Sequence, residues 1–217
     1  MPWPKNHKSR TRDRIVRAAA AAFRARGVSD VRVDDIMAGA GLTHGGFYAH
    51  FSSKDDLLGA ALVRANCETI DTLAKALESI PAGQRLHAVI DTYLSPQHAA
   101  HPEKGCPVAA LGPEIARASG KKRRDLAREL RIRLDWLRGV VSNEGRDNVQ
   151  EEHVVGAMAC MVGGLILARV VDRNDSAALL EMCREFLHRA LGETSHAAAT
   201  RRPARRRRQR VPERRVS

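Results

Sequence analysis

Aromatic side chains are scarce in this chain: Phe, Trp and Tyr together make up 4% of its 217 residues. Long runs of β-branched residues, which favour strands, are also missing. Alanine, leucine and arginine are abundant instead, and these residues have high helix propensity. With 43% hydrophobic residues, the chain can still fill a sizeable core. The composition therefore predicts an all-α protein.

Cysteine is also rare, and the four cysteines are far apart: Cys67, Cys106, Cys160 and Cys183. They form no C-x-x-C pair and have no histidine at the spacing of a zinc site. This pattern argues against a disulfide framework and a zinc finger, and gives no reason to expect a metal or another cofactor. We expect reduced thiols in a cytoplasmic protein.

Several common signatures are missing. The chain has no glycine-rich phosphate loop, no H-E-x-x-H, no G-x-S-x-G and no paired-acid constellation, which disfavours an enzyme. The basic N-terminus, MPWPKNHKSRTR, is not followed by the apolar segment and cleavage site of a secretory signal. The longest uncharged apolar run, Val154 to Ala168, is shorter than the roughly 18 residues expected of a membrane span. We expect a soluble protein with no membrane partner.

Positive charge is concentrated at the two ends of the chain, whose net charge is +12 at pH 7. Residues 1–54 hold ten Lys and Arg against four Asp, a net charge of +6. Residues 201–217 hold nine Arg against one Glu, a net charge of +8, whereas the long middle carries only −2. A basic head on a nearly neutral body suggests that the head binds phosphate groups and that the body has another task.

Apolar residues recur at helical spacing along most of the chain, and turn residues separate the helices. In the first helix Ile15, Ala19 and Phe23 share one face, and Gly27 ends the pattern. The expected later helices are residues 33–40, 43–50, a long helix capped by Ser52 or Ser53 that ends at 80, 84–94, 108–118, 121–143, 151–171 and 176–191.

Two short helices meet at a glycine-containing turn near the N-terminus. The first fits Val33–Ala40, Gly41 lies in the turn, and Thr43 is placed to cap a helix that runs through His50. Such a pair is the signature of a helix-turn-helix, whose second helix enters the major groove of DNA. Taken alone the signal is weak, because many helical hairpins share it.

A longer stretch carries a more specific signal. Residues 33–58, VDDIMAGAGLTHGGFYAHFSSKDDLL, resemble the DNA-binding motif of the TetR family of transcriptional regulators. The shared pattern is an Ile in the first helix, a Gly-Leu turn, an aromatic residue followed by Tyr, a His-Phe pair, a Ser followed by Lys, and a Leu pair. The close match covers roughly the first quarter of the chain.

The resemblance implies a three-helix helix-turn-helix domain that a long helix joins to a helical ligand-binding and dimerisation domain. On this basis the expected domains are a disordered basic arm at 1–9, a helix-turn-helix DNA-binding domain at 10–55, a helical effector-binding and dimerisation domain at 56–192 and a disordered Arg-rich tail at 193–217.

The resemblance also implies which residues meet DNA: Arg32, Thr43, His44, Gly45, Gly46, Tyr48, His50 and Lys54. The residues of the first turn would face the groove, and Tyr48 and His50 would reach phosphates. Lys54 lies in the first turn of the next helix, where the helix dipole disfavours a cation unless a phosphate is near. The alternatives are an ordinary surface imidazole for His44 and a half-buried packing role for Tyr48.

Gly45 and Gly46 would each cost about 1 kcal/mol relative to alanine in a helix interior, so bare backbone must be useful at these positions. We expect it to approach the groove wall and the phosphates closely. Phe47 and Phe51, four residues apart, share a face and are expected in the core.

Other arginines are candidates for DNA contact. Arg10, Arg12 and Arg14 could bind the backbone or minor groove, or simply form a solvated basic face. Many family members carry Ser or Thr just before the first helix of the motif, but this chain has Arg32 followed by Val33. We therefore expect the capping bond to be lost and Arg32 to serve as a phosphate or base contact.

By resemblance, the last two long helices, residues 151–191, form a homodimer. Residues 151–171 are apolar nearly all round, and Gly156, Gly163 and Gly164 permit close approach of another helix. The alternative is that this segment is the buried central helix of a monomer.

The stretch KGCPVAALGPEIARAS, residues 104–119, is similar to one in a subgroup of the family that includes reactive-electrophile sensors. Cys106 follows Lys104 and precedes a short helix, so it is either a sensing thiol or a small buried hydrophobe. Tyr93, Trp136, Met158 and Met161 could line a pocket for an apolar effector, although core positions have the same pattern.

Together these features indicate a repressor that binds a palindromic operator in double-stranded DNA as a homodimer and is released by a small-molecule effector. The tail RRPARRRRQR has too little apolar content to fold and would add salt-sensitive affinity for any DNA sequence. The alternative is a nonspecific architectural DNA-binding protein that depends on its basic ends.

Overall fold

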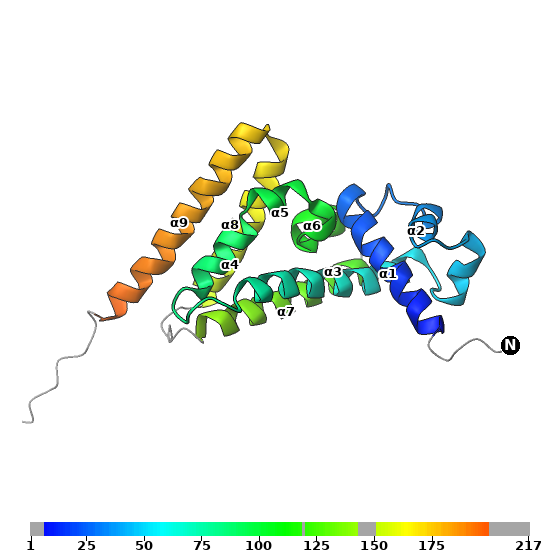
Figure 1. Ribbon diagram of the computed structural model, residues 1–217, viewed down its shortest axis with the longest axis horizontal. Helices are drawn as coiled ribbons and strands as arrows, with labels where there is room; N and C mark the ends of the chain where they lie inside the picture. The colour runs from blue at the N-terminus through cyan, green and yellow to red at the C-terminus, as the bar shows by residue number, and fades with distance from the viewer. Residues whose placement is uncertain (1–6, 119, 143–150, 200–217) are drawn as a thin grey trace, which may run out of the picture.

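The computed structural model describes residues 7–118, 120–142 and 151–199, and all regular structure in these ranges is helical (Figure 1), so the predicted all-α class is confirmed. In chain order the elements are α1 (His7–Arg26), α2 (Val33–Gly39), the 3-10 helix η1 (His44–Ala49), α3 (Lys54–Ala76), α4 (Arg85–Tyr93), α5 (Pro96–Ala100), the 3-10 helix η2 (Pro102–Lys104), α6 (Pro107–Arg117), α7 (Lys121–Ser142), α8 (Glu151–Val170) and α9 (Arg173–Ala199).

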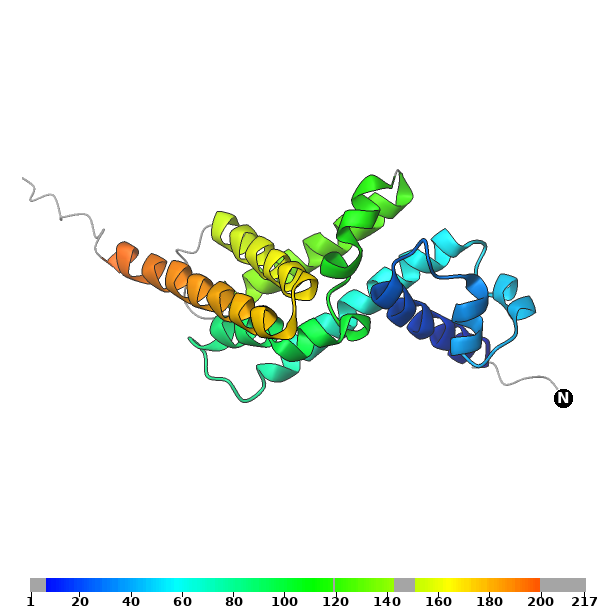
Figure 2. The same ribbon diagram turned by 90° about the horizontal axis from the view of Figure 1, so that it is seen from above.

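The molecule is elongated, with a small head at one end and a larger body at the other (Figure 1). The head consists of α1, α2, η1 and the start of α3, and the rest of α3 runs into the body beside α7 (Figures 1 and 2). At the far end α8 and α9 pack against each other as a helical hairpin (Figure 2). The long α3 thus joins the two parts as one continuous element.

Two hydrophobic cores match this division. The head core gathers buried residues of α1, α2, η1 and α3, including Phe23, Phe47 and Phe51. It also takes in Leu111 and Ile115 of α6, so the head rests on an element of the body. The body core is built from α3, α4, α6, α7, α8 and α9.

Local signals in the sequence explain where the head helices begin and end. Gly27 has a φ of +85°, a left-handed conformation that ends α1, and its N–H donates to the Phe23 carbonyl at 2.8 Å. Ser53 precedes α3, and its Oγ accepts from the Asp56 N–H at 3.1 Å. The Asp56 carboxylate accepts in return from the Ser52 N–H at 3.3 Å, so the expected cap is present.

Some element boundaries differ from the expectations. Helix α1 begins at His7, inside the expected 1–9 arm, and α9 continues to Ala199, inside the expected 193–217 tail. Helix α3 ends at Ala76, and the residues up to Pro81 form turns. The short α5 and η2 lie in a stretch that we expected to be a loop. Residues 201–217, the Arg-rich end, lie outside the described residues.

The expected third α-helix is instead the 3-10 helix η1. Its first bond runs from the Gly46 N–H to the Thr43 carbonyl at 3.1 Å, three residues back. Thr43 occupies the N-cap position as expected, but its side chain makes no capping hydrogen bond. Six residues that include two glycines have little propensity to form a regular α-helix.

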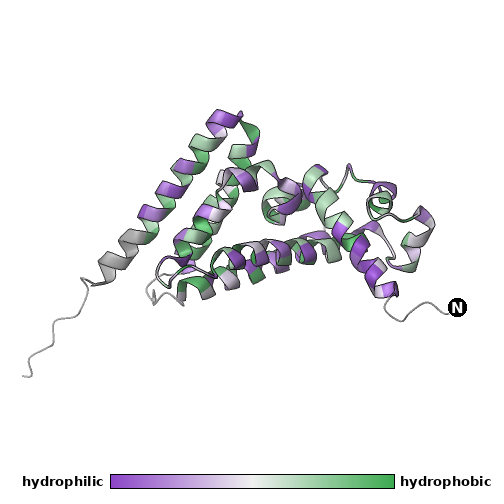
Figure 3. Ribbon diagram, in the orientation of Figure 1, coloured by the Kyte–Doolittle hydropathy of each residue, from purple (hydrophilic) through white to green (hydrophobic). Residues whose placement is uncertain are grey.

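Helix α8 is apolar over most of its surface (Figure 3). An 18-residue window of this 20-residue helix has a mean hydropathy of 1.8, which by length and composition alone would suit a membrane span. The same pattern is typical of a core helix, and α8 packs against α6, α7 and α9. Helix α8 is longer than the uncharged run from Val154 to Ala168, which we expected to be too short to span a membrane.

Candidate DNA-binding face and effector cavity

The turn of the helix-turn-helix is held by a side chain from α1. Gly41 in this turn has a φ of +65°, and the Arg14 guanidinium donates to the Ala40 carbonyl at 2.5 Å. A Cβ on Gly41 would lie 2.9 Å from Arg14 Nη2. Arg14, a candidate DNA contact from sequence, is thus engaged in fixing the angle between α2 and η1.

The aromatic residues in η1 and just after it lie on opposite sides. Phe47 and Phe51 are 1% and 2% exposed, and their rings stack with centroids 6.0 Å apart, which agrees with the expected core role. Tyr48 is 68% exposed, so the half-buried packing alternative does not describe it. The side of η1 away from the core therefore presents a tyrosine to the outside.

No contact with a described residue requires glycine at positions 45 and 46. A Cβ on Gly45 would meet nothing within 4 Å, and a Cβ on Gly46 would make an ordinary 3.6 Å contact with Met37. Neither residue has a positive φ. Because folding does not explain this pair, the bare backbone points to a requirement outside the chain.

Thr43 and His44 are exposed at the start of η1. His44 Nδ1 pairs with the Asp34 carboxylate of α2, which fixes the orientation of the imidazole. Among the described residues, Nε2 of the same ring has no hydrogen-bond partner. His44 is therefore an oriented side chain with one ring nitrogen left for another molecule.

Cationic residues border η1. Lys54 is half-buried in the first turn of α3 and makes no ion pair with any described residue. At the other end of η1, burial lowers the pKa of His50, and the nearby charges of Lys8, Arg12 and His7 lower it further. The Arg12 guanidinium lies 4.7 Å from the centre of the Phe51 ring. The start of α1 thus places cations beside the end of η1.

Arg32 occupies the N-cap position of α2, and its guanidinium makes no capping bond, as expected. Its backbone N–H instead donates to the Asp35 carboxylate at 3.2 Å, which replaces half of a capping box. The Arg32 side chain is 81% exposed, and its nearest acidic partner is Asp34 at 3.9 Å. The guanidinium remains free to contact an outside group.

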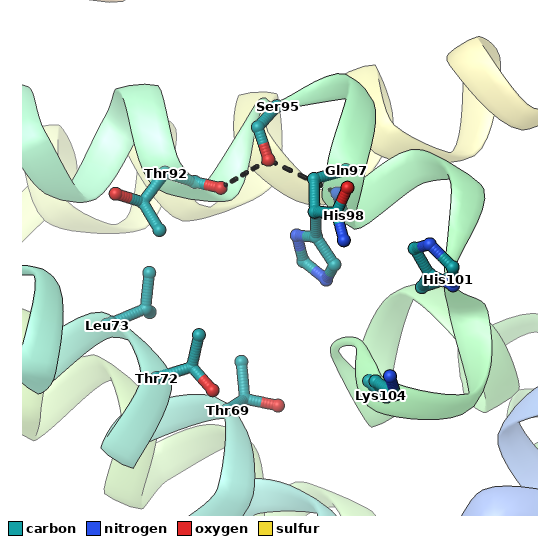
Figure 4. Close-up of a pocket in the computed structure, with 9 residues that line it drawn as sticks. All are labelled: Thr69, Thr72, Leu73, Thr92, Ser95, Gln97, His98, His101 and Lys104. Carbon is teal, nitrogen blue, oxygen red and sulfur yellow. Dashed lines mark hydrogen bonds between the residues drawn. The ribbon is translucent and has the colours of Figure 1, made fainter.

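The body contains a cavity of about 250 Å³ where α3, α4, α5 and η2 meet (Figure 4). Thr69, Thr72 and Leu73 of α3 face side chains from the α4–α5 segment across it (Figure 4). The complete lining is Thr69, Thr72, Leu73, Thr92, Ser95, Gln97, His98, His101 and Lys104.

None of the residues that we expected to line an effector pocket lies in the wall of this cavity. Tyr93, Trp136 and Met158 do not line this cavity and belong to the packing of the body core. Tyr93 is 1% exposed and its ring meets His98 edge-on, with centroids 4.7 Å apart. Large apolar side chains fill the core, whereas polar residues that cannot be buried without partners surround the cavity. In the sequence, Thr69 and Thr72 interrupt the apolar stripe of α3, and this interruption was the signal for a cavity wall at this position.

Cys106 is completely buried. Its backbone N–H donates to His98 Nε2 at 3.1 Å, and His98 Nδ1 lies 2.7 Å from the Tyr93 carbonyl. In this conformation the thiol is a small buried hydrophobe, one of the two roles considered for it. No group of His, Cys, Asp and Glu suited to a metal ion is found among the described residues.

The cavity wall is bonded directly to the head. Arg24 of α1 is 4% exposed, and its Nη1 donates to the Gly105 carbonyl at 3.0 Å while Nη2 meets Glu68 Oε2 at 2.6 Å. Thr69 Oγ1, which lines the cavity, donates to the same Gly105 carbonyl at 3.3 Å. One carbonyl group thus links the cavity to the first helix of the head.

A second connection runs through α6. The Glu114 carboxylate accepts from the backbone N–H groups of Val28 and Ser29, both at 2.8 Å, and from Ser29 Oγ at 2.7 Å. Burial alone would raise the pKa of Glu114, but these hydrogen bonds and the charge of Lys54 hold it below its ordinary value. Sequence reasoning missed Arg24 and Glu114, because their partners are distant in the chain.

The α8–α9 hairpin leaves apolar side chains exposed. Val155 and Val170 on α8 are 44% and 78% exposed, and Met182 and Phe186 on α9 are each 55% exposed. A Cβ on Gly156 or Gly163 would meet nothing within 4 Å. By contrast, a Cβ on Gly164 would lie 2.9 Å from Cys183 Sγ, so this glycine serves packing within the hairpin.

The first group of similarities to known proteins covers only part of the chain. The sequence profile of the bacterial regulatory proteins of the tetR family matches residues 15–61, which include the turn and η1. The HTH-type transcriptional regulator TtgR of Pseudomonas putida is 43% identical over 75 residues, which are 35% of either chain. The match thus spans about a third of the length of this curated relative.

Other similarities extend over most of the chain. The HTH-type transcriptional repressor DhaR of a Mycobacterium species is 29% identical over 75% of this chain and 84% of that protein. A TetR transcriptional regulator from Chloroflexus aurantiacus has a crystal structure with a TM-score of 0.73 and 26% identity, covering 86% of this chain and 96% of that one. Reduced E. coli NemR shares the fold, with a TM-score of 0.70, 18% identity and coverage of 83% and 96%.

These similarities agree with the geometry of the head, in which a fixed turn presents η1, and with the all-helical body that α3 joins to it. The chain belongs to the TetR family of bacterial regulatory proteins.

Proposed function

We propose that this protein is a cytoplasmic transcriptional repressor that binds a palindromic operator as a homodimer and leaves it when a small-molecule effector binds the body. The observation that carries the proposal is the outer side of η1. There Tyr48 is exposed, Lys54 has no ion pair among the described residues, and Gly45 and Gly46 have no packing role. A protein face with these properties suits the wall of a DNA groove.

Each residue has a role on this face. Thr43 and His44 would read base edges in the major groove, with His44 oriented by Asp34. Bare backbone at Gly45 and Gly46 would approach the DNA closely. Tyr48 and Lys54 would bind phosphates on one side of the groove, and His50 and Arg32 would add contacts at its edges.

The homodimer would form through the α8–α9 hairpin, residues 151–191. Helical spacing puts the exposed Val155 and Val170 and the half-buried Ile166 on one face of α8, and Met182 lies one turn from Phe186 on α9. The open space at Gly156 and Gly163 would let a partner helix approach closely. An exposed apolar face of this kind argues against a monomer in which α8 is simply a buried central helix.

Effector release would use the link between cavity and head. A ligand that displaces η2 or Thr69 would also displace Gly105, whose carbonyl holds Arg24 of α1. Moving α1 in each protomer changes the distance between the two heads, and a palindromic operator demands a fixed half-site separation. The Cys106 thiol is buried, so the segment between η2 and α6 would have to open before this thiol could react with an electrophile.

The test is selection of DNA fragments from a random library by the purified protein, followed by competition with random DNA. We expect enrichment of one inverted repeat and at least a roughly thousandfold preference for it, the range typical of specific DNA-binding proteins. An architectural DNA-binding protein would enrich no motif, and random DNA would compete equally well. That outcome would overturn the proposal.

A further inference from the structure

The cavity in the body is lined by hydroxyl, amide and imidazole groups and one cation, with no acid among its lining residues. The hydroxyls of Thr69, Thr72 and Ser95 already donate to backbone carbonyls, so the donors left for a ligand lie elsewhere in the lining. Lys104 lies exposed at its mouth and makes no ion pair with a described residue. The Thr92 hydroxyl and the Gln97 amide likewise have no hydrogen-bond partner among the described residues. His101 pairs through Nδ1 with Glu103 at 3.2 Å, which is the acidic group adjoining the mouth.

Positively charged groups outside the lining also act on His98 in the cavity wall. Burial and the charges of Arg169, Arg133 and Arg24 together lower the pKa of His98 to about 4, although its hydrogen bond to the Tyr93 carbonyl opposes the shift. His98 is therefore neutral at pH 7, but it lies within the field of three guanidinium groups. Two acids offset this field in part: Glu68 pairs with Arg24, and Glu129 reaches Arg133 through Asn66.

One of these guanidinium groups is incompletely paired. Arg133 is 1% exposed and donates from Nε and Nη2 to Asn66 Oδ1, at 3.0 Å and 2.6 Å. Its Nη1 is buried and has no hydrogen-bond partner among the described residues. A buried cation with an unused donor adds to the positive potential at His98 in the cavity wall.

The cavity also has an apolar part. Leu73 and the methyl groups of Thr69, Thr72 and Thr92 contribute apolar surface to its walls (Figure 4). A volume of about 250 Å³ lies just below the usual range for drug-sized ligands, so the occupant must be compact.

We propose that this cavity binds a compact organic anion, a monocarboxylate with a short apolar body whose carboxylate is held among Lys104, His101 and Gln97. That this anion is the effector rests on the function proposed above. That the cavity binds it rests on the donors, the cations and the volume of the cavity.

Matched probes of different charge test the proposal on the full-length protein without DNA. Binding of benzoate, benzamide and benzylamine, and of butyrate, butyramide and butylamine, is measured by isothermal titration calorimetry. In at least one series the carboxylate should bind about tenfold or more tightly than the amide, because charge-assisted hydrogen bonds are stronger than neutral ones, and the amine should not bind. Equal binding of amide and carboxylate, or no binding of either carboxylate at millimolar concentration, would overturn it.

A substitution at the mouth locates the site. Lys104→Met keeps an unbranched side chain one heavy atom shorter and removes the charge. It should weaken binding of the carboxylate about tenfold while changing binding of the amide by less than about threefold. Lys75→Met, at an exposed lysine in the last turn of α3 that does not line the cavity, is the matched control and should leave both affinities unchanged. Equal effects of the two substitutions would contradict the assignment.

Operator selection, carried out separately from calorimetry, distinguishes failure of the anion site from failure of the proposed function. If the carboxylate binds but the protein enriches no operator, the proposed function fails and the anion site stands. If an operator is bound and the calorimetry shows no preference for carboxylates, the function stands and the anion site fails.

Discussion

At the scale of single residues, the glycines of η1 separate what folding needs from what a partner needs. Gly45 has free space around its Cβ position and no positive φ. We expect Gly45→Ala to keep or raise the free energy of unfolding, by up to about 1 kcal/mol, because alanine has higher helix propensity and lower entropy in the unfolded chain. Operator affinity should fall, because the added methyl group would separate the backbone from DNA.

Urea unfolding and gel-shift titration check this pair of effects. Gly41→Ala is the control for a glycine that folding does require, since φ is +65° and Arg14 Nη2 would lie 2.9 Å from the new Cβ. That variant should lose about 1–2 kcal/mol of stability. Wild-type operator affinity in Gly45→Ala would show that the backbone of η1 does not approach DNA.

Tyr48 and His44 should affect DNA binding differently. Tyr48 is 68% exposed, so Tyr48→Phe should leave stability unchanged and weaken binding to all sequences alike by removing a phosphate contact. His44→Ala should instead change the preference at particular base pairs by about 1–3 kcal/mol. Affinities for a panel of operators with single base changes check this. An equal loss on every operator in His44→Ala would refute a reading role.

How far sequence predicts a site residue depends on where its partners are. Helical spacing alone separated Phe47 and Phe51 from Tyr48, because a short helix fixes which residues share a face. The pairing of His44 with Asp34 could not be predicted, since it depends on the angle between α2 and η1. The cavity residues were missed for a similar reason: Thr69 and Lys104 come from elements that only tertiary packing brings together.

At the scale of elements, α6 holds the head through Glu114, and acid should weaken this contact. The pKa of Glu114 is lower in the folded than in the unfolded chain. The stability it contributes is therefore fully present above its unfolded pKa of about 4.5 and is lost as pH falls through the folded value. Glu114→Gln should lose about 1–3 kcal/mol at pH 7, because an amide cannot accept from all of its partners.

Urea midpoints at pH 7 and at pH 3.5 check the contribution of this carboxylate. The loss caused by Glu114→Gln should be smaller at the lower pH, where the wild-type carboxyl is partly protonated. Glu78→Gln, at an exposed residue beyond the end of α3, is the control and should change neither midpoint. An equal loss from Glu114→Gln at both pH values would contradict the role of its charge.

The link between Arg24 and Gly105 should carry the response to the effector. Arg24→Lys keeps a positive charge for Glu68, but a lysine cannot also reach the Gly105 carbonyl with a second donor. We expect ligand affinity within about twofold of wild type and a clear loss of ligand-induced release from DNA. Calorimetry and operator titration with and without ligand measure the two quantities. Full release in Arg24→Lys would show that coupling takes another route.

Helices with a sustained apolar pattern were predictable, and segments of three to six residues were not. Helices α7 and α8 lie close to their expected limits because their apolar periodicity extends over many turns. The 3-10 form of η1 and the presence of α5 and η2 were missed, because segments of three to six residues are fixed by neighbours such as Arg14 and His98. These short elements carry the DNA-binding face and part of the cavity wall.

At the scale of the whole molecule, the head and the α8–α9 hairpin lie at opposite ends (Figure 1). A dimer formed through the hairpins would hold two heads apart, and successive major grooves on one side of DNA are about 34–36 Å apart. Small rotations of each protomer would then be amplified at the heads. In the proposed dimer, this separation would let a ligand in the body cavity change DNA binding at the far end.

The hairpin interface can be tested with one exposed residue. Phe186 is 55% exposed in the protomer, so Phe186→Asp should leave the fold of the single chain intact, but two such charges would face an apolar partner surface. We expect sedimentation as a monomer and at least a roughly hundredfold weaker binding to a palindromic operator, with binding to an isolated half-site unchanged.

Ile132→Asp, at a residue of α7 that is 45% exposed and lies outside the hairpin, places the same charge on another apolar surface position. It should sediment as the dimer and bind the palindrome normally. If Phe186→Asp also remained dimeric, the two-fold axis would have to lie elsewhere, and the exposed apolar face of α8 and α9 would need a different partner. The two variants thus separate a general effect of surface charge from the loss of this interface.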